Sequence, residues 1–202
     1  MIDAQRFARL VTDAVVRRPL LWRLFRRPLR TMFDGLAPSW ETRIGEHHLW
    51  AFDLALEGVP APRRVLDLGT GTGVVAIALA ERYPEALVVG LDISPGMIEE
   101  ARRKLPTELA GRVGFEVGDA AALAYPDGDF ELVVLSNMIP FFDELARVVA
   151  PEGTLVFSSS RGDETPIYVA PERLREELGR RGFAEFAEFS AEPATALRAK
   201  RR

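Results

Sequence analysis

The first sixty residues of the chain carry apolar side chains at helical spacing. The first set recurs every three or four positions and consists of Ile2, Phe7, Leu10, Val11, Ala14 and Val15. This spacing predicts an amphipathic helix, which Pro19 is expected to stop or kink. A second helical pattern covers residues 20–28, and residues 33–39 carry turn-forming sequences. A third helical stretch, 46–57, ends at Gly58, a residue type favoured just after a helix.

From residue 64 the pattern changes to short apolar runs separated by helical stretches. The runs that predict buried strands are 65–68, 87–91, 113–117, 132–135 and 154–158. The helical stretches are 74–83, 95–104, 141–149 and 171–181. Strands that alternate with helices at this interval indicate a parallel, doubly wound sheet.

The end of the chain departs from this alternation. Two strand-like segments, 183–189 and 195–199, are separated by too few residues for a crossover helix, so they are expected to form an antiparallel hairpin. The predicted fold is therefore α/β, a doubly wound seven-stranded sheet that is parallel except for a C-terminal antiparallel hairpin. We expect residues 1–60 to form an N-terminal helical lid and residues 61–202 to form the main domain.

Composition narrows the possible classes of protein. The chain has 202 residues, of which 48% are apolar and 28% charged, and this describes one ordinary globular domain. The absence of Cys excludes disulfides, thiolate zinc sites and iron–sulfur clusters, and no ligand-spaced cluster predicts a metal site. No apolar run approaches the ~18 residues of a membrane span, and no signal-peptide core is present, so a cytoplasmic protein is expected.

Charge is distributed unevenly along the chain. The first thirty residues carry eight Arg and two Asp, a balance of +6, whereas the whole chain has a net charge of −4, so the remainder sums to −10. An acidic body argues against nucleic acid as a partner. The basic residues within 17–30 could contact a membrane surface or an acidic partner, or they could form a solvated helical face.

A glycine-rich loop follows the first predicted strand. Gly69, Gly71 and Gly73 precede a helix, where small residues let backbone approach a ligand and the helix terminus offers free N–H groups. Asp92 ends the second predicted strand, where a carboxylate can accept hydrogen bonds from ribose hydroxyls. The alternative role for Asp92 is a helix cap, which Ser94 could fill instead. A dinucleotide-binding loop would place its third glycine where Val74 stands.

Five segments in order resemble the motifs of the class I S-adenosylmethionine-dependent methyltransferases. They are Val65–Gly73, Val89–Ser94, Gly118–Ala120, Phe130–Asn137 and Leu145–Leu155. The resemblance covers roughly residues 40–200 and implies a Rossmann-like fold with S-adenosyl-L-methionine as cofactor.

The same resemblance implies a set of cofactor-binding residues in the first motif. Gly69 and Gly71 would pass beneath the methionine part of the cofactor, and Asp67 would orient its amino group, with water between them. Thr70 and Gly73 belong to the same cofactor-binding loop. Asp92, from the second motif, would hold the ribose hydroxyls.

The remaining motifs imply contacts with the adenine and the methyl group. Ile93 and Met97 would pack on the faces of the adenine, although plain core packing suits them equally. Asp119 would accept a hydrogen bond from the exocyclic amine, and the N–H of Ala120 would meet a ring nitrogen. Asn137 ends the strand beside the methyl group and is included among the cofactor-binding residues.

The loop after the fourth predicted strand bears on the acceptor. Residues 137–141 resemble, without matching, the Asn-Pro-Pro-aromatic motif of amino-methylating relatives, so methylation of a base or of glutamine is not expected. Met138, Ile139, Phe141 and Phe142 could wall an apolar acceptor pocket or could pack in the core. The sequence favours methyl transfer to a small acceptor, lipophilic if that pocket forms, and leaves O-, N- and C-methylation open. A non-catalytic cofactor-binding regulator or partner subunit and a nucleotide-dependent oxidoreductase are the alternatives.

Two adjacent histidines offer a candidate for proton removal. His47 and His48 point about 100° apart on a helix, so at most one of them is expected to face a cleft. His47 lies three residues from both Ile44 and Trp50 on the apolar stripe of that helix. His47 is therefore the candidate base or acceptor-orienting residue, unless both histidines are structural.

Overall fold

The fold is a seven-stranded sheet covered by helices, in a computed structural model that describes residues 4–43 and 49–202. The strands are β1 (Arg64–Leu68), β2 (Leu87–Asp92), β3 (Val113–Val117), β4 (Phe130–Ser136), β5 (Val149–Ser159), β6 (Phe183–Ala191) and β7 (Ala194–Arg201). Their order across the sheet is β3-β2-β1-β4-β5-β7-β6. Neighbours among β1 to β5 pair in parallel, and β7 pairs antiparallel with both β5 and β6. The predicted α/β fold class and its terminal hairpin are confirmed.

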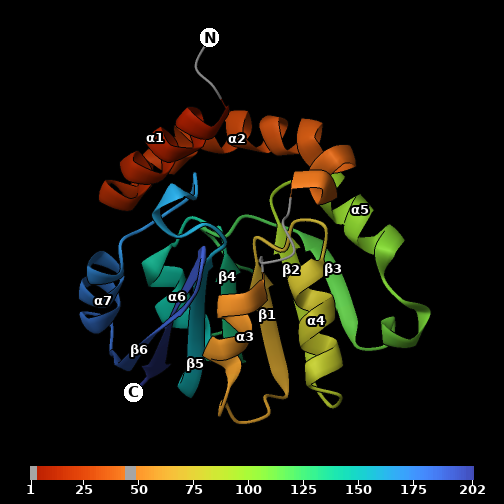
Figure 1. Ribbon diagram of the computed structural model, residues 1–202, viewed down its shortest axis with the longest axis vertical. Helices are drawn as coiled ribbons and strands as arrows, with labels where there is room; N and C mark the ends of the chain where they lie inside the picture. The colour runs from red at the N-terminus through yellow and green to blue at the C-terminus, as the bar shows by residue number, and fades with distance from the viewer. Residues whose placement is uncertain (1–3, 44–48) are drawn as a thin grey trace.

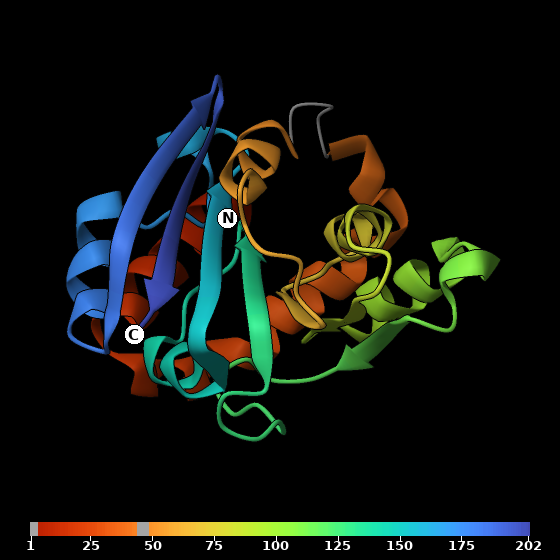
Figure 2. The same cartoon turned by 90° about the horizontal axis from the view of Figure 1, so that it is seen from below.

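Helices cover both faces of this sheet. On one face lie α3 (Trp50–Leu56), α4 (Val74–Arg82) and α5 (Pro95–Lys104), and on the other lie α6 (Phe142–Val148) and α7 (Pro171–Gly179). Side chains alternate between the two faces along each strand, so Val65 packs with the first group of helices and Leu66 with the second. Both side chains have 0% exposure because β1 lies between β2 and β4. Figure 2, seen from below, shows β6 and β7 at one edge of the sheet.

A helical arm, residues 4–43, precedes these elements. It consists of α1 (Ala4–Arg17), η1 (Pro19–Leu21), α2 (Trp22–Leu36) and η2 (Ala37–Arg43). Figure 1 shows α1 and α2 lying across the top of the molecule, above the carboxyl ends of the strands. Their apolar side chains at helical spacing, such as Val11, Val15 and Leu29, are buried in the core that includes α6 and α7.

The sequence-based boundaries within this arm were partly wrong. Helix α2 continues through Pro28, and residues 33–35, predicted as a turn, form its last turn. Pro28 is exposed, so water can bond the carbonyl that its missing N–H leaves free, while Trp22 and Leu29 on the opposite side are buried. Tertiary packing therefore outweighs the local helix-breaking signal. The predicted third helix is present from Trp50, and its first residues, 46–48, lie outside the described part of the chain.

Short 3₁₀ turns complete the described structure. They are η4 (Thr107–Leu109) and η5 (Gly162–Glu164). Within residues 4–43 and 49–202, no helix is both long and apolar enough to cross a membrane.

Candidate functional site

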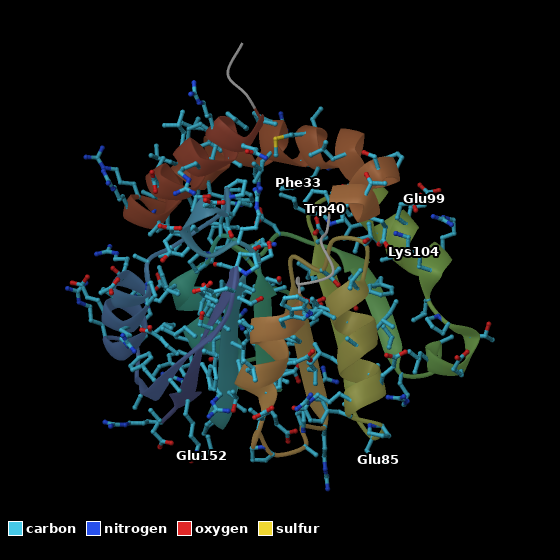
Figure 3. All side chains as sticks on the ribbon, viewed as in Figure 1. Phe33, Trp40, Glu85, Glu99, Lys104 and Glu152 are labelled. Carbon is cyan, nitrogen blue, oxygen red and sulfur yellow. The ribbon has the colours of Figure 1, made fainter. Side chains whose placement is uncertain are left out.

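A cavity of about 420 Å³ lies between the helical arm and the carboxyl ends of the strands. Nine of its lining residues come from the arm, including Trp22, Phe33 and Trp40. Figure 3 shows Phe33 and Trp40 close together beneath α2, where their rings meet edge to face with centroids 5.7 Å apart. The other lining residues come from the carboxyl ends of strands, from the loops that follow them and from the first turns of α4 and α5. The roof and the floor of the cavity therefore come from distant parts of the sequence.

Most of the predicted cofactor-binding residues line this cavity. The lining members are Gly69, Thr70, Gly71, Asp92, Ile93, Met97, Ala120 and Asn137. Three predicted residues, Asp67, Gly73 and Asp119, are not among the lining residues. Each of these three residues has different surroundings.

The three glycines of the loop after β1 have different surroundings. All have positive φ angles, of 79° at Gly69, 53° at Gly71 and 85° at Gly73, which L side chains adopt at a cost. A Cβ added at Gly73 would lie 2.6 Å from the Phe115 ring, so this glycine lets α4 pack closely on the sheet. A Cβ at Gly71 would meet only Trp40, at 3.4 Å. The backbone of Gly71 therefore faces the cavity with few neighbouring atoms beside it.

Asp92 ties the loop after β1 to the loop after β2. Its Oδ2 accepts a hydrogen bond from the Gly71 N–H and its Oδ1 accepts one from the Ser94 N–H, both at 2.9 Å. Burial raises the pKa of Asp92 to about 6, although these two hydrogen bonds act to lower it. Ser94, not Asp92, caps α5, because its hydroxyl accepts from the Met97 N–H at 3.1 Å. Asp92 is thus left as a carboxylate on the cavity wall.

Asp67 lies behind the glycine loop and is 1% exposed. Its Oδ2 accepts a 2.6 Å hydrogen bond from the Thr70 hydroxyl, whereas its buried Oδ1 has no hydrogen-bond partner among the described residues. Burial raises the pKa of Asp67 to about 7, although hydrogen bonding from the Thr70 hydroxyl and the Ala76 backbone acts to lower it, and the nearby charge of Asp92 acts in the same direction as burial. An unpartnered buried carboxylate oxygen is costly, so a hydrogen-bond donor or cation at this point would be stabilising.

Asp119 is held by the arm. Its Oδ1 accepts hydrogen bonds from Trp22 Nε1 at 2.7 Å and from the Ala121 N–H at 3.0 Å. Its Oδ2 lies 3.5 Å from the guanidinium of Arg26. The neighbouring Ala120 does line the cavity. The segment after β3 therefore contributes Ala120 to the site, while the carboxylate of Asp119 binds the arm above the cavity.

Two further carboxylates of the arm contact the same loops. Asp34 Oδ1 accepts hydrogen bonds from the Ser94 hydroxyl at 2.6 Å and the Gly96 N–H at 3.1 Å. Partial burial acts to raise the pKa of Asp34, but these bonds and Arg30 outweigh it and hold the pKa below its ordinary value. Sequence reasoning missed this role because Asp34 and Ser94 are 60 residues apart.

Glu41 forms the second of these contacts. Its Oε1 accepts from the Thr72 hydroxyl at 2.8 Å and from Lys104 Nζ at 2.7 Å, which joins η2 to the glycine loop and to α5. The hydrogen bonds from Lys104 and Thr72 hold the pKa of Glu41 below its ordinary value, despite partial burial. The arm is therefore attached to the loops after β1, β2 and β3 by polar contacts as well as by packing.

The loop after β4 forms the remaining wall. Asn137 has a φ of 51°, and its amide bonds both the hydroxyl and the N–H of Ser160, at 3.0 and 2.9 Å. Met138 and Ile139 line the cavity. Phe141 and Phe142 do not line it and are buried in the core. Each of the two predicted roles therefore holds for two of the four residues: Met138 and Ile139 line the cavity, and Phe141 and Phe142 pack in the core.

The proposed base, His47, lies outside the described residues, as does His48. Its role stays a prediction.

Comparison with known proteins agrees with this geometry. The sequence profile of the methyltransferase domain family matches residues 65–153. The chain is 43% identical over 141 residues to demethylmenaquinone methyltransferase of Thermus thermophilus, covering 62% of each protein. It is 40% identical over 151 residues to malonyl-[acyl-carrier protein] O-methyltransferase of Halorhodospira halophila, covering 69% of this chain and 50% of that one. The chain thus spans less than two thirds of the length of either relative.

A solved structure supports the same fold. Magnesium protoporphyrin IX methyltransferase from Synechocystis, determined with bound S-adenosylhomocysteine, superposes with a TM-score of 0.65 at 21% identity. The match covers 88% of this chain and 99% of that one. Residues 65–153 therefore match a methyltransferase domain in sequence, and the chain shares its fold with S-adenosylmethionine-dependent methyltransferases.

Proposed function

We propose that this protein transfers a methyl group from S-adenosyl-L-methionine to a small acceptor with an apolar body. The observation that carries the proposal is the cavity itself. One region of the cavity is polar and contains the backbone of Gly71 and the carboxylate of Asp92. Another region is apolar and is lined by side chains such as Met138 and Ile139. A site of this kind suits one ligand that is polar and a second that is not.

The residues present fit the cofactor. The unpartnered Oδ1 of Asp67 suits a positively charged amino group, reached directly or through water, and that charge would restore the ionised form of a carboxyl whose pKa is raised to about 7. Each oxygen of Asp92 accepts one backbone hydrogen bond and keeps capacity for a ribose hydroxyl. When bound, the cofactor supplies an electrophilic methyl group on a cationic sulfur.

The adenine end of the site is assigned to the segments after β2 and β3. Ile93 and Met97 supply apolar contact area on the cavity wall, and the N–H of Ala120, which also lines the cavity, is assigned as a donor to a ring nitrogen. Asp119 is proposed to accept from the exocyclic amine through Oδ2, since its Oδ1 already accepts from Trp22 and Ala121. In this chain the adenine pocket and the roof therefore share one carboxylate.

The acceptor is assigned to the apolar half of the cavity, beneath the arm. Leu29, Met32 and Phe33 face this space from above and Met138 and Ile139 from the β4 loop. Holding an acceptor atom in line with the methyl group is the main task of the protein in such a reaction, because orientation alone can supply an effective molarity of ~10⁵ M or more.

Proton removal from a hydroxyl or protonated amine is assigned to His47, or to solvent if that residue is structural. Once an acceptor is known, His47→Asn and His48→Asn are compared at saturating cofactor across pH 6–9. Parental turnover by both variants throughout that range excludes a histidine base.

Calorimetry with S-adenosylhomocysteine tests the cofactor assignment. The protein is expected to bind it, with NAD binding much more weakly, and Asp92→Ala should weaken binding by at least about tenfold, since hydrogen bonds to a charged group are each worth ~1.5–3 kcal/mol. Asp53→Ala, an exposed aspartate on α3, is the matched control. Unchanged affinity in Asp92→Ala, or a preference for NAD, contradicts the assignment.

A pooled-metabolite screen with isotope-labelled S-adenosylmethionine and a mass readout tests the activity. Transfer of label to an acceptor together with release of S-adenosylhomocysteine is the expected result. Cofactor binding with no turnover on any acceptor would favour the alternative of a non-catalytic binding protein.

A further inference from the structure

The junction between α1 and α2 exposes arginine and leucine side chains together. We call this set the junction face, and it consists of Arg17, Arg18, Leu20, Arg23, Leu24 and Arg27. Leu20 on η1 is 78% exposed and Leu24 on α2 is 68% exposed, the two highest values among the large apolar side chains that the structure describes. Figure 3 shows nitrogen-tipped side chains projecting outward from the arm.

The seven arginines within residues 9–30 fall into two groups. Arg9, Arg26 and Arg30 are engaged with the rest of the protein, through the Thr165 carbonyl, Asp119 and Asp34 respectively. The four arginines of the junction face have neither a carboxylate nor a hydrogen-bond partner for their guanidinium groups among residues 4–43 and 49–202. Within the described part of the chain their charges make no contact that holds the arm in place, and this leaves them to an external anion.

The chemistry of this face selects a partner that is both anionic and apolar. The net charge is +6 over the first thirty residues and −10 over the remainder, so the arm carries a large local excess of positive charge on an acidic body. Arginine binds phosphate groups well, and leucine side chains gain free energy by leaving water for the region of the acyl chains. An acidic segment without apolar side chains would satisfy the arginines but not the two exposed leucines. A bilayer with anionic headgroups satisfies both.

The opposite side of the same turn reaches the cavity. Trp22 lies between Leu20 and Leu24 in sequence, yet it is 4% exposed and lines the cavity. A surface that holds the junction face therefore lies next to the roof of the site. We propose that the junction face docks the protein on the surface of a bilayer that contains anionic lipids. This inference goes beyond the proposed methyl transfer and does not depend on cofactor binding.

Vesicle flotation of the full chain tests the proposal. Vesicles of phosphatidylcholine alone are compared with vesicles in which one third of the lipid is phosphatidylglycerol. The protein is expected to float with the anionic vesicles only, and less so at high salt because exposed charges are screened. Each arginine near such a surface contributes about fivefold in partitioning, so replacing Arg17, Arg18, Arg23 and Arg27 with Gln should lower it by about two orders of magnitude or more.

A control variant removes four positive charges outside the arm. Arg63, Arg82, Arg180 and Arg202 are exposed and lie outside the arm, and their replacement with Gln should leave flotation near the parental level. The double variant Leu20→Ser, Leu24→Ser should weaken flotation while keeping the salt dependence. Calorimetry with S-adenosylhomocysteine should give parental affinity for all of these variants, which separates failure of docking from failure of the proposed function.

Three outcomes overturn the proposal. One is a parental protein that does not float with anionic vesicles, and another is an equal loss in both arginine variants, which would report net charge alone. The third is binding of polyglutamate as tight as vesicle binding, with no effect of the leucine substitutions. That result would assign the junction face to an acidic protein.

Discussion

The indole Nε1 of Trp22 donates a 2.7 Å hydrogen bond to Oδ1 of Asp119, across 97 residues of sequence. This bond joins the roof of the cavity to the segment after β3. Trp22 also packs edge to face on Phe141, at the start of α6, with ring centroids 5.2 Å apart. One buried side chain of the arm thus contacts two loops at the carboxyl edge of the sheet.

Trp22→Phe is expected to destabilise the fold by at least ~1.5–3 kcal/mol, because it removes a donor to a carboxylate and replaces the buried indole with a smaller ring. Urea unfolding of Trp22→Phe, Asp119→Asn and the double variant measures the coupling of the pair. Trp50→Phe, at the exposed start of α3, is the control for loss of a tryptophan. Strictly additive effects of the two substitutions would show that the bond contributes nothing.

Gly71→Ala and Gly73→Ala should separate binding from stability. Both place a Cβ on a residue with positive φ, at ~1–2 kcal/mol each. At Gly73 the added carbon also meets the Phe115 ring, which costs a further ~1–3 kcal/mol of overpacking. Gly71→Ala, whose Cβ points toward the cavity and Trp40, should lose more S-adenosylhomocysteine affinity than Gly73→Ala. Thermal unfolding measures the stability of both variants, and calorimetry measures their affinity for S-adenosylhomocysteine. A larger loss of affinity in Gly73→Ala than in Gly71→Ala would contradict this geometry.

Asp67→Asn should make the ligand-free protein less sensitive to alkaline pH. The pKa of Asp67 is raised in the folded state, from an ordinary 3.8 to about 7, so folding favours its protonated form. Its contribution is fully present below its ordinary pKa and is lost as pH rises through about 7, at ~1.4 kcal/mol per pKa unit. The unfolding free energy of the parent should therefore fall between pH 5 and pH 8 by more than that of the variant.

The same substitution should weaken S-adenosylhomocysteine binding, since a neutral amide cannot balance an amino group. Asp13→Asn, an exposed aspartate on α1, is the control and should behave as the parent in both experiments. Parallel pH profiles for the parent and Asp67→Asn would show that the buried carboxyl does not titrate in this range.

The terminal hairpin is expected to be essential to the sheet. Leu197 is 3% exposed on β7, between β5 and β6, and Leu197→Ala should cost ~2–5 kcal/mol. Leu87→Ala, at a site with 47% exposure on β2, should cost much less. Deletion of residues 183–202 should abolish the cooperative thermal transition, and a truncated protein that melts at the parental temperature would contradict this role.

Features encoded over short stretches of sequence were predictable. The alternation of apolar runs with helical stretches predicted the strands and the hairpin, because burial on both faces of a parallel sheet requires such runs. The glycine spacing and Asp92 likewise marked the loops of the cavity, because these positions follow directly after strands.

Features that depend on distant partners were not predictable. Nothing near Asp119 in sequence shows that Trp22 would bond it, and nothing near Glu41 points to Thr72 and Lys104. The error at Pro28 has the same origin, since burial of Trp22 and Leu29 against the rest of the fold overrode a local signal.

The matched methyltransferase region, residues 65–153, supplies one side of the cavity, and the arm, residues 4–43, supplies the other. These two walls are encoded in separate stretches of the gene and meet through polar contacts and through the apolar faces of α1 and α2 that pack in the core. Mutation and selection can therefore reshape the side of the cavity that the arm forms, beneath which we place the acceptor, while the glycine loop and Asp92 stay unchanged. An enzyme built this way can acquire a new substrate in evolution by exchanging its first forty residues, provided that the replacement keeps donors for Asp119 and an acceptor for Ser94.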